Sequence, residues 1–469
     1  MIEKQDYQVE FDKHEPLSEL TAEKSLIGVE DVQFISEALY DMDRKAIFHY
    51  IEPFHKADIA DLIEQLPSDQ RVEFVRVLGQ KFDPEILNCL DDDIREKLIN
   101  NLDVQSLAKA VEKLESDEAV DIIEDLEEES KQQLYQFISE KNRLLIEEAL
   151  SFPDESAGRM MHREIVVLPS FWTVGDTIDF LRQESALPDN FYEIFVVDAK
   201  FQPVGVLHLS TILKNKRSLC IADLMSKKYY PVSANMDREV VADMFRQYRL
   251  VSAPVVNDEG RLVGEITVDD IFPVIDEEAD EDLMKMAGVS DDNLYGAAFY
   301  TARTRFSWLL INLATAILAS IVIAFFEATI EKVVALAVLM PIVASMGGNA
   351  GTQTLAVSVR ALATKRINNR NAFKIVTKET LVGFFNGIAF SLLVGLVSWL
   401  WFSDKVIAFV IAISMIINMI VAGIFGLIIP LALQKYKIDP AVASPVILTT
   451  VTDIVGFFSF LGLAAWIII

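Results

Sequence analysis

The residue that most constrains the chemistry of this chain is Asp453, which lies inside a long apolar stretch near the C-terminus. Three hydroxyl side chains, Thr449, Thr450 and Thr452, precede it closely. A carboxylate at membrane depth costs roughly 2.5–3.5 kcal/mol on insertion scales, so it is a functional-site hypothesis by default. Carboxylates are also preferred ligands of hard cations. The sequence therefore predicts a cation site at Asp453.

The C-terminal part contains five apolar stretches, and Asp453 lies in the last of them. Each is long enough to cross a hydrocarbon core of about 30 Å, which takes roughly 20 helical residues. The predicted spans cover residues 306–326, 333–362, 381–402, 406–433 and 441–469. If the last span enters at Asp439, a helical rise of about 1.5 Å per residue places Asp453 roughly 21 Å along its axis. We therefore expect Asp453 beyond the middle of the membrane, towards the side opposite the entry.

Basic residues between the spans predict the orientation. Arg303 and Arg305 precede the first span, and Lys435 and Lys437 separate the fourth from the fifth. The loop between the second and third spans carries Lys365, Arg366, Arg370, Lys374 and Lys378. The two alternate loops carry Lys332 and Lys405 as their basic residues. By the positive-inside rule, the N-terminus is expected in the cytoplasm and the C-terminus outside a multi-pass cell-membrane protein.

The second span contains a polar, small-residue segment at residues 341–353. It begins with Pro341, includes three glycines, and carries the amides Asn349 and Gln353. Interrupted backbone at membrane depth occurs only where it is buried in protein or lines a wet cavity. We therefore expect a broken helix whose carbonyls and amides line an ion pathway. The alternative is close helix packing through small residues.

The rest of the chain is strongly acidic. Residues 301–469 contain 12 basic and 6 acidic residues, whereas the preceding part contains 30 basic and 64 acidic residues. Such acidity excludes a nucleic-acid-binding surface, which needs a basic footprint, and suits either solubility or contact with cations. Cys89 and Cys220 lie far apart, which indicates a reducing compartment. The polar start of the chain, residues 1–30, carries no recognisable signal peptide.

A helical repeat is predicted within residues 1–152. Related apolar patterns occur at residues 59–66, 107–114 and 119–126. Their helical spacing indicates short helices stacked as a superhelix. Asp117 and Asp121 share one helix face, where like charges destabilise by a few tenths of a kcal/mol unless a cation lies between them. The alternative is a solvated acidic face.

A duplicated module is predicted within residues 153–275. Residues 161–169 match residues 225–233, and each copy continues with an amphipathic helix and a β hairpin. Short helices are expected to close the copies at residues 210–213 and 268–272. The segment resembles a tandem pair of CBS domains. That resemblance implies a regulatory module and makes ATP a possible ligand, although no residue pattern here defines a nucleotide site.

A connector, residues 276–305, joins this module to the first span. It holds six carboxylates within residues 276–282. Charge runs of this kind are usually disordered or form a solvated helix face. Its position before the membrane favours a different interpretation, because carboxylate clusters at domain interfaces are natural Mg²⁺ or Ca²⁺ sites.

With these parts in this order, the chain resembles the MgtE-type magnesium channels. The resemblance rests on "DEAVD" in the helical repeat, the CBS pair, "EEADEDLMKMAGVS", "PIVASMGGNAGTQ" and "DPAVAS…TTVTDIVG". It implies a multidomain membrane protein with an α-helical superhelical N domain (1–152), an α/β tandem CBS pair (153–275), a connecting plug helix (276–305) and a five-helix α transmembrane domain (306–469). The family consists of homodimers whose pore lies between the protomers. The resemblance therefore implies a second copy of the chain and membrane lipid as partners.

The resemblance also implies roles for individual residues. Asp453 corresponds to the pore aspartate that holds hydrated Mg²⁺, and Asp439 corresponds to an acid at the cytoplasmic mouth. The implied Mg²⁺ sensors, which close the pore when cytosolic Mg²⁺ is plentiful, are Asp117, Asp121, Asp237, Asp270, Glu278, Glu281 and Asp282. Two departures from the family pattern are Ser444-Pro445-Val446, near the expected cytoplasmic gate, and Pro273, which stands where relatives tend to have an acid.

Two other function classes fit parts of the sequence. A membrane-anchored CBS sensor would use its spans for anchorage and would pass no ions. A coupled secondary transporter of divalent cations would need a coupling-ion site, and no second intramembrane acid is apparent in the sequence. An enzyme is not expected, because no nucleophile–base constellation or phosphate loop is recognisable.

Overall fold

The computed structural model describes residues 27–184, 187–188, 191–289, 298–368 and 370–468. The chain divides into two compact units, Met1–Val274 and Ile275–Ile469, and each is described by itself. The start of the predicted N domain, residues 1–26, lies outside the described residues. So do residues 290–297 of the predicted connector.

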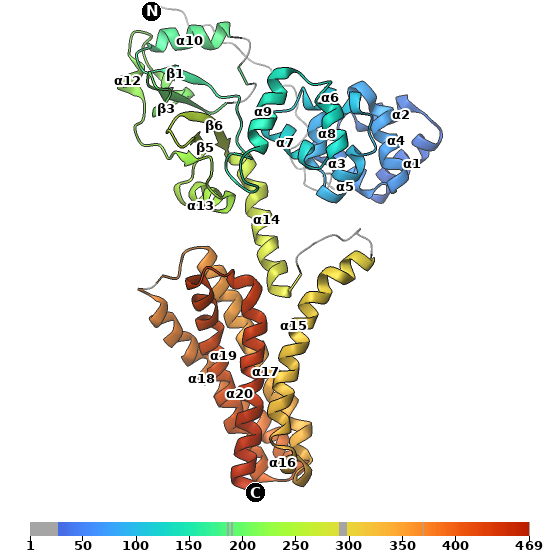
Figure 1. Ribbon diagram of the computed structural model, residues 1–469, viewed down its shortest axis with the longest axis vertical. Helices are drawn as coiled ribbons and strands as arrows, with labels where there is room; N and C mark the ends of the chain where they lie inside the picture. Colours follow the sequence, from blue (N-terminus) through green and yellow to red (C-terminus); the bar gives the residue numbers. More distant parts are fainter. Residues whose placement is uncertain (1–26, 185–186, 189–190, 290–297, 369, 469) are drawn as a thin grey trace, which may run out of the picture. The chain divides into compact units, whose positions relative to one another are not determined.

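The first unit begins with a succession of short helices (Figure 1). They are α1 Val29–Tyr40, α2 Arg44–Ile51, α3 Lys56–Gln65, α4 Ser68–Leu78, the 3₁₀ helices η1 Gly79–Lys81 and η2 Pro84–Cys89, α5 Asp92–Ile99, α6 Val104–Val111, α7 Ser116–Glu124, α8 Glu128–Leu134 and α9 Glu140–Leu150. The three repeated patterns fall on α3, α6 and α7, as the sequence predicts. One continuous apolar core joins these helices, because each short helix buries its apolar stripe on its neighbours.

Helix α6 illustrates why these segments are helical and amphipathic. The Asp103 carboxylate caps it by accepting from the backbone N–H of Ser106 at 2.9 Å. Leu107, Ala108 and Val111 then recur at helical spacing and are all buried. The helix therefore begins at a side-chain cap and is held in place by its buried stripe.

Two three-stranded sheets follow, one for each copy of the duplicated module (Figure 1). The first copy consists of β1 Val167–Pro169, α10 Val174–Gln183, β2 Glu193–Val197, β3 Pro203–His208, α11 Leu209–Lys214 and α12 Ile221–Leu224. The second consists of β4 Val232–Ser233, α13 Arg238–Tyr248, β5 Ser252–Val256, β6 Leu262–Thr267 and α14 Val268–Ala287. In each sheet the first strand is parallel to the second, which forms an antiparallel hairpin with the third.

The two copies also pair with each other through equivalent positions. His162, before the first copy's sheet, forms an antiparallel bridge with Glu265 on β6. Ser226, its counterpart in the second copy, forms the same bridge with Val206 on β3. Each copy therefore donates a short segment to the last strand of the other.

Helix α14 differs from the sequence prediction. The expected short closing helix at residues 268–272 is wrong, because the helix continues without a break through the acidic run to Ala287. Pro273 lies within its second turn, where the missing N–H removes one i→i−4 hydrogen bond without ending the helix. The helix stops at Gly288, whose φ of 73° suits glycine.

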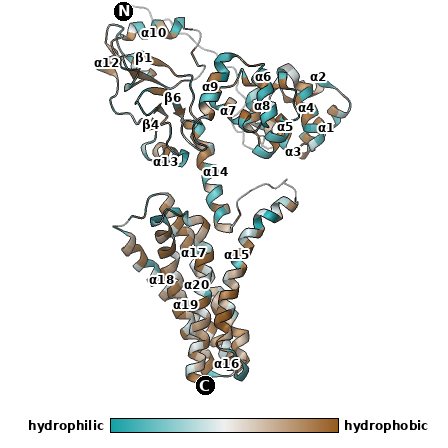
Figure 2. Ribbon diagram, in the orientation of Figure 1, coloured by the Kyte–Doolittle hydropathy of each residue, from teal (hydrophilic) through white to brown (hydrophobic). Residues whose placement is uncertain are grey.

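The second unit contains the five predicted spans, which the structure confirms as long apolar helices. They are α15 Ala298–Ala324, α17 Ala335–Ala363, α18 Ala372–Phe402, α19 Lys405–Lys435 and α20 Pro440–Ile468, with the short α16 Glu327–Lys332 after the first. Figure 2 shows how hydrophobic these helices are in comparison with the mixed colouring of α1–α9. Lys374 and Lys378, predicted in a loop, lie in the first turns of α18.

The expected break in the second span is also wrong. Helix α17 runs continuously through residues 341–353. Two of its glycines serve close packing instead, since a Cβ on Gly351 would lie 3.1 Å from Leu448 and one on Gly347 only 2.1 Å from Asn418. The small-residue alternative therefore describes this part of α17, because the absence of side chains lets neighbouring helices approach.

Candidate metal centre and membrane carboxylate

Asp453 lies at the middle of α20 and is half-buried. The preceding hydroxyls donate to carbonyls of their own helix: Thr449 to Pro445 at 3.0 Å, Thr450 to Val446 at 2.6 Å and Thr452 to Leu448 at 3.1 Å. These protons are therefore used within α20. The hydroxyl oxygens keep acceptor capacity for other groups.

The buried amide of Asn418 lies against α20 one helical turn after Asp453. Asn418 of α19 is fully buried, and its Nδ2 donates to the Val343 carbonyl of α17 at 2.8 Å. Gly347 and Gly456 leave the space that the amide occupies, since a Cβ on either would lie within 2.8 Å of it. Asn418 thus cross-links α17, α19 and α20 around the turn of α20 that follows Asp453.

Asp439 belongs to a group of charged residues that we call the Lys285 cluster: Glu281, Asp282, Lys285 and Asp439. Asp439 caps α20 by accepting from the backbone N–H of Ala441 at 2.8 Å. Its other carboxylate oxygen lies 3.3 Å from Lys285 Nζ, and Glu281 Oε1 lies 2.6 Å from the same ammonium. One lysine of α14 therefore joins the acidic connector to the start of the last span.

The Lys285 cluster perturbs its own titration. Burial, followed by the negative charge of Asp439, raises the pKa of Asp282 above its ordinary value. Burial alone would lower the pKa of Lys285, but its contacts with Glu281 and Asp439 outweigh that effect and raise it. Negative charge exceeds positive charge in this cluster, because it contains three carboxylates and one ammonium group. Glu278 lies one turn earlier on α14 and is half-buried.

The first unit contains a second group, the His162 cluster: Glu115, Asp117, His162 and Asp270. Nδ1 of His162 lies 2.7 Å from Glu115 Oε2 and 3.1 Å from Asp117 Oδ1. Nε2 of the same ring lies 2.8 Å from Asp270 Oδ2. The imidazole therefore occupies the space between Asp117 and Asp270, two of the carboxylates predicted as Mg²⁺ sensors.

Backbone pairing fixes His162 in this position. Its N–H donates to the Glu265 carbonyl at 2.8 Å, and its carbonyl accepts from the Glu265 N–H at 2.9 Å. The close approach needs Gly264, because a Cβ there would lie 2.5 Å from the His162 carbonyl oxygen. Strand β6 then leads directly into α14, where Asp270 accepts from the Thr267 N–H at 2.9 Å.

The other side of the His162 cluster comes from the first turn of α7. Glu115 is the N-cap residue of that helix, and Asp117 follows within its first turn. The Ser116 hydroxyl accepts from the Arg163 N–H at 2.9 Å and donates to Glu164 at 2.8 Å. These contacts hold the start of α7 against the segment that carries His162.

The His162 cluster is buried and electrostatically strained. Asp117 and His162 are each only 9% exposed. Burial raises the pKa of the Asp117 carboxyl, and although burial alone would lower the pKa of His162, its three carboxylate neighbours raise it well above its usual range. Asp117 Oδ1 and His162 Nδ1 are fully buried, and neither has a partner in hydrogen-bond geometry.

Besides Glu278, two predicted sensors lie outside both clusters. Asp121 is one turn beyond Asp117 on α7 but is exposed to solvent. Asp237 caps α13 by accepting from the backbone N–H of Glu239 at 2.9 Å, and it too is exposed. Within the part of the chain that the structure describes, the one metal-compatible grouping of three or more ligands is Glu115, Asp117 and His162.

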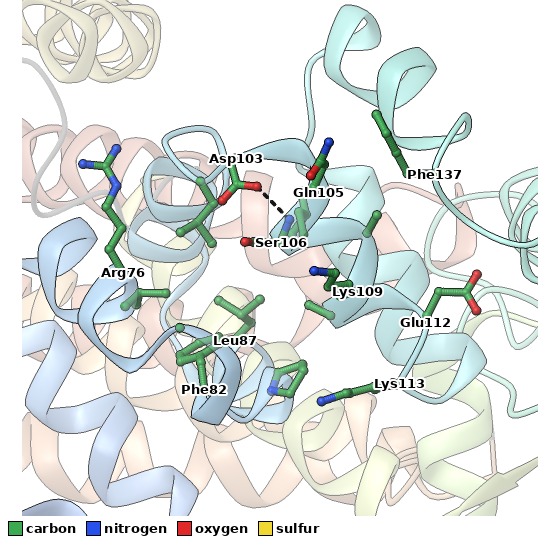
Figure 3. Close-up of a pocket in the computed structure, with 17 residues that line it drawn as sticks. Arg76, Phe82, Leu87, Asp103, Gln105, Ser106, Lys109, Glu112, Lys113 and Phe137 are labelled. Carbon is green, nitrogen blue, oxygen red and sulfur yellow. Dashed lines mark hydrogen bonds between the residues drawn. The ribbon is translucent and has the colours of Figure 1, made fainter. Parts of the chain in front are cut away.

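A separate pocket lies among the helices of the N-terminal part (Figure 3). Figure 3 shows Lys109 and Lys113 near apolar side chains that include Phe82 and Leu87. The residues that line it include none of the predicted site residues. We assign no role to it.

Sequence reasoning missed four residues of these sites: Glu115, His162, Lys285 and Asn418. His162 had a usable signal, because the duplicated module places Ser226 at the equivalent position, so a histidine there is a difference between the copies. Lys285 was visible as the one base close behind the acidic run. Asn418 and Glu115 carried no signal, since an isolated amide or a surface glutamate is common.

The fold and the position of Asp453 together define a class of protein. A stack of short helices and a CBS pair precede five long apolar helices, the last with a carboxylate at its centre. This combination describes a membrane protein with attached α-helical and α/β domains. Comparison with known families assigns residues 54–155 to the MgtE intracellular N domain, 157–218 and 221–277 to CBS domains, and 340–463 to the MgtE divalent cation transporter family.

The chain belongs to the MgtE family. It is 32% identical to the magnesium transporter MgtE of Thermus thermophilus over 92% of this chain and 97% of that protein. It is 34% identical to the magnesium transporter MgtE of Bacillus subtilis over 68% of this chain and 71% of that protein. A solved cytosolic domain of the Mg²⁺ channel MgtE in complex with ATP is 28% identical and covers 52% of this chain and 99% of that structure, with a TM-score of 0.49.

Proposed function

We propose that this chain forms a homodimeric magnesium channel in the cell membrane, with its first unit in the cytoplasm and its C-terminus outside. Hydrated Mg²⁺ is the transported substrate. Asp453 of each protomer holds the ion in a pore, and cytosolic Mg²⁺ closes that pore through the connector. Membership of the MgtE family supports this proposal.

The observation that carries the pore assignment is the position of Asp453. It is a half-buried carboxylate at the centre of the last span, beside helices that pack through glycines and a buried amide. Mg²⁺ gives up its water reluctantly, so a pore for it should hold the ion through water. Two symmetry-related carboxylates would attract the dication, and their contact through water would leave it free to move on.

The acidic connector is the proposed gating element. Asp282 and Asp439 lie close enough that the charge of one raises the pKa of the other. Carboxylates crowded in this way fit a divalent cation, whose binding would relieve their repulsion. Mg²⁺ then favours whichever state of the channel binds it more tightly, and we propose that this state is closed.

Flux into liposomes tests the pore. Purified protein should admit Mg²⁺ electrogenically, and Asp453→Asn should abolish the flux because it removes the carboxylate charge without changing its size. Glu331→Gln is the matched control, because Glu331 is an exposed acid of the same unit, and it should retain wild-type flux. Wild-type protein that passes no Mg²⁺ would sink the channel proposal.

Neutralisation of the connector tests the gate. The triple variant Glu278→Gln, Glu281→Gln, Asp282→Asn should keep the pore open at Mg²⁺ concentrations that close the wild type. Inhibition by Mg²⁺ that is unchanged in this variant would refute the sensor role of α14. The same assay excludes a membrane-anchored sensor if the wild type conducts, and a coupled transporter if conduction needs no ion gradient other than that of Mg²⁺.

Adenine-nucleotide binding at the CBS pair follows from the resemblance and is tested separately. Equilibrium dialysis of the full chain with labelled ATP measures it directly. Saturable binding, at a fixed number of ATP molecules per chain, would support a nucleotide site at residues 153–275. The absence of binding would leave the channel proposal intact, because neither the pore nor the connector assignment uses it.

A further inference from the structure

The His162 cluster does not suit Mg²⁺ at Asp117 or Asp270, two of the carboxylates that the family resemblance implies as Mg²⁺ sensors. Mg²⁺ takes oxygen ligands, whereas here an imidazole ring occupies the space between the two carboxylates, with Nδ1 3.1 Å from Asp117 and Nε2 2.8 Å from Asp270. A Mg²⁺ ion bridging Asp117 and Asp270 directly would have to displace the ring. Backbone pairing with Glu265 holds the segment that carries the ring.

The same atoms form the ligand set of a different metal. Glu115, Asp117 and His162 each offer a donor atom within 4.8 Å of the others. Two carboxylate oxygens and an imidazole nitrogen suit first-row transition ions, which accept nitrogen ligands more readily than Mg²⁺ does. Three protein ligands also leave a position for water, as in many sites of this kind.

Asp270 completes the arrangement from the far side of the ring. Metal-bound histidines usually donate their other N–H to a carboxylate, which fixes the ring and increases its basicity. Nε2 of His162 has such a partner in Asp270 Oδ2 at 2.8 Å. Asp270 is itself held by the N–H and hydroxyl of Thr267 at 2.9 and 2.8 Å. Asp270, which the resemblance implies as a metal-binding carboxylate, therefore contacts the imidazole of His162 rather than the metal position itself.

Two buried atoms point to a ligand at this position. Asp117 Oδ1 and His162 Nδ1 have no solvent access and no partner in hydrogen-bond geometry. Nδ1 lies 2.7 Å from Glu115 and 3.1 Å from Asp117, and an ion shared by these atoms is one explanation for buried contacts that lack hydrogen-bond geometry. Ligand atoms about 2.1 Å from a tetrahedral metal lie about 3.4 Å apart. The contacts of 2.7 and 3.1 Å at Nδ1 would therefore open by less than about 1 Å to admit an ion.

The duplication supplies an internal comparison. Strand register places Ser226 at the position of His162 and Thr211 at the position of Asp270. The two copies share the cross-copy bridge and the glycine that permits it, Gly205 in one and Gly264 in the other. The fold of the CBS pair therefore needs neither the imidazole nor the carboxylate at this position, which leaves a specific role for both.

We propose that Glu115, Asp117 and His162 bind a divalent transition ion of the Mn²⁺, Co²⁺ or Zn²⁺ class in preference to Mg²⁺, with Asp270 positioning the imidazole. Because its ligands come from α7 and from the segment before β1, the bound ion fastens the helical N-terminal part to the CBS pair. The inference refines the regulatory part of the proposed function. The first unit would then respond to a transition metal ion as well as to the transported Mg²⁺.

Cobalt supplies a test that does not depend on transport. The purified full chain in detergent is titrated with Co²⁺ while visible absorption is recorded, because a nitrogen-containing site of low coordination number absorbs far more strongly than Co²⁺ in an all-oxygen octahedral site. The wild type should develop an intense band at one Co²⁺ per chain. The band should persist in about a hundredfold excess of Mg²⁺, which competes poorly for nitrogen ligands.

Variants assign the band to the cluster. His162→Ser, the residue that the other copy carries, should abolish it. His208→Ser should retain it, because the half-exposed His208 pairs with Glu193 at 3.0 Å and is not among the three candidate ligands. Asp270→Asn should weaken Co²⁺ binding about 10–100-fold, the usual effect of losing a partner of a metal-bound histidine. Glu115→Gln, at a half-exposed side chain, provides a ligand variant with little risk of misfolding and should also weaken binding.

Three results would overturn the inference: no intense band in the wild type, a band unchanged in both His162→Ser and Glu115→Gln, or equal competition by Mg²⁺. None of them bears on the pore, whose flux is measured in liposomes. A conducting channel without the band would overturn this inference alone. A band in a protein that passes no Mg²⁺ would leave the inference standing and sink the channel.

Discussion

The two charged clusters of this chain are built alike but lie in different surroundings. In each, one cationic or cation-forming side chain contacts several carboxylates, His162 in the first unit and Lys285 in the second. The side chains of His162 and Asp117 are 11% and 13% exposed, whereas those of Lys285 and Asp439 are 29% and 41% exposed. Charges interact more strongly where water is excluded, so the same arrangement has different consequences in the two places.

This difference in burial suits the His162 cluster to a structural role and the Lys285 cluster to a role in gating. Loss of one partner from a buried ion cluster leaves an uncompensated charge and is strongly destabilising. Partly exposed pairs contribute little and are screened by salt, so their arrangement changes readily when an ion arrives. The His162 cluster therefore suits a durable joint between α7 and the CBS pair, and the Lys285 cluster suits a gate.

The largest effect should come from removal of the buried cation. His162→Ser leaves the carboxylates of Glu115, Asp117 and Asp270 facing one another, and it should destabilise the local structure by about 3 kcal/mol or more. Hydrogen exchange at the first turn of α7 measures this as faster opening. His208→Ser should leave exchange at α7 unchanged. Equal exchange in the two variants would show that the buried cluster is no stronger than the surface pair.

A smaller effect is expected at a carboxylate outside both clusters. Asp237→Ala removes the cap of α13, which should cost about 1 kcal/mol and speed exchange at the start of that helix. Asp237→Ser restores a capping side chain and should recover most of the loss. Neither variant should alter closure of the pore by Mg²⁺. A change in closure would place Asp237 among the ion sensors after all.

The exposed cluster should respond more weakly than the buried one. Lys285→Met removes the ammonium beside Glu281 and Asp439, and it should loosen α14 by at most about 1 kcal/mol, because a partly exposed pair is screened. The effect on exchange at α14 should shrink as salt increases. Lys285→Arg keeps the charge and should behave as wild type. A loss as large as that of His162→Ser would remove the distinction drawn between the clusters.

The smallest effect is expected at Asp121. This carboxylate shares the face of Asp117 but is exposed to solvent, and Asp121→Asn should change the stability of α7 by no more than about 0.5 kcal/mol. Its Co²⁺ band should match that of the wild type, since it supplies no ligand to the cluster. A weakened band would extend the cluster by one turn of α7.

Sequence patterns located most of the architecture but few of the contacts. The helical repeat, both CBS copies and all five spans were predictable, because each leaves a periodic or continuous apolar signal over many residues. The uninterrupted helices α14 and α17 were not, since proline and glycine mark possible breaks rather than certain ones. In α17 the backbone stays helical, and Gly347 and Gly351 pack against Asn418 and Leu448, neighbours that sequence spacing does not reveal.

The individual carboxylates divide in the same way. The sequence by itself determined that Asp453 is a costly acid within an apolar span, because length and hydropathy fix membrane depth without any knowledge of packing. Only the tertiary structure decided which other acids meet a cation. His162 reaches Asp117 and Asp270 across 45 and 108 residues of chain because strand β6 and helix α7 converge on its segment. The burial of these charged pairs, rather than their number, sets the strength of each interaction.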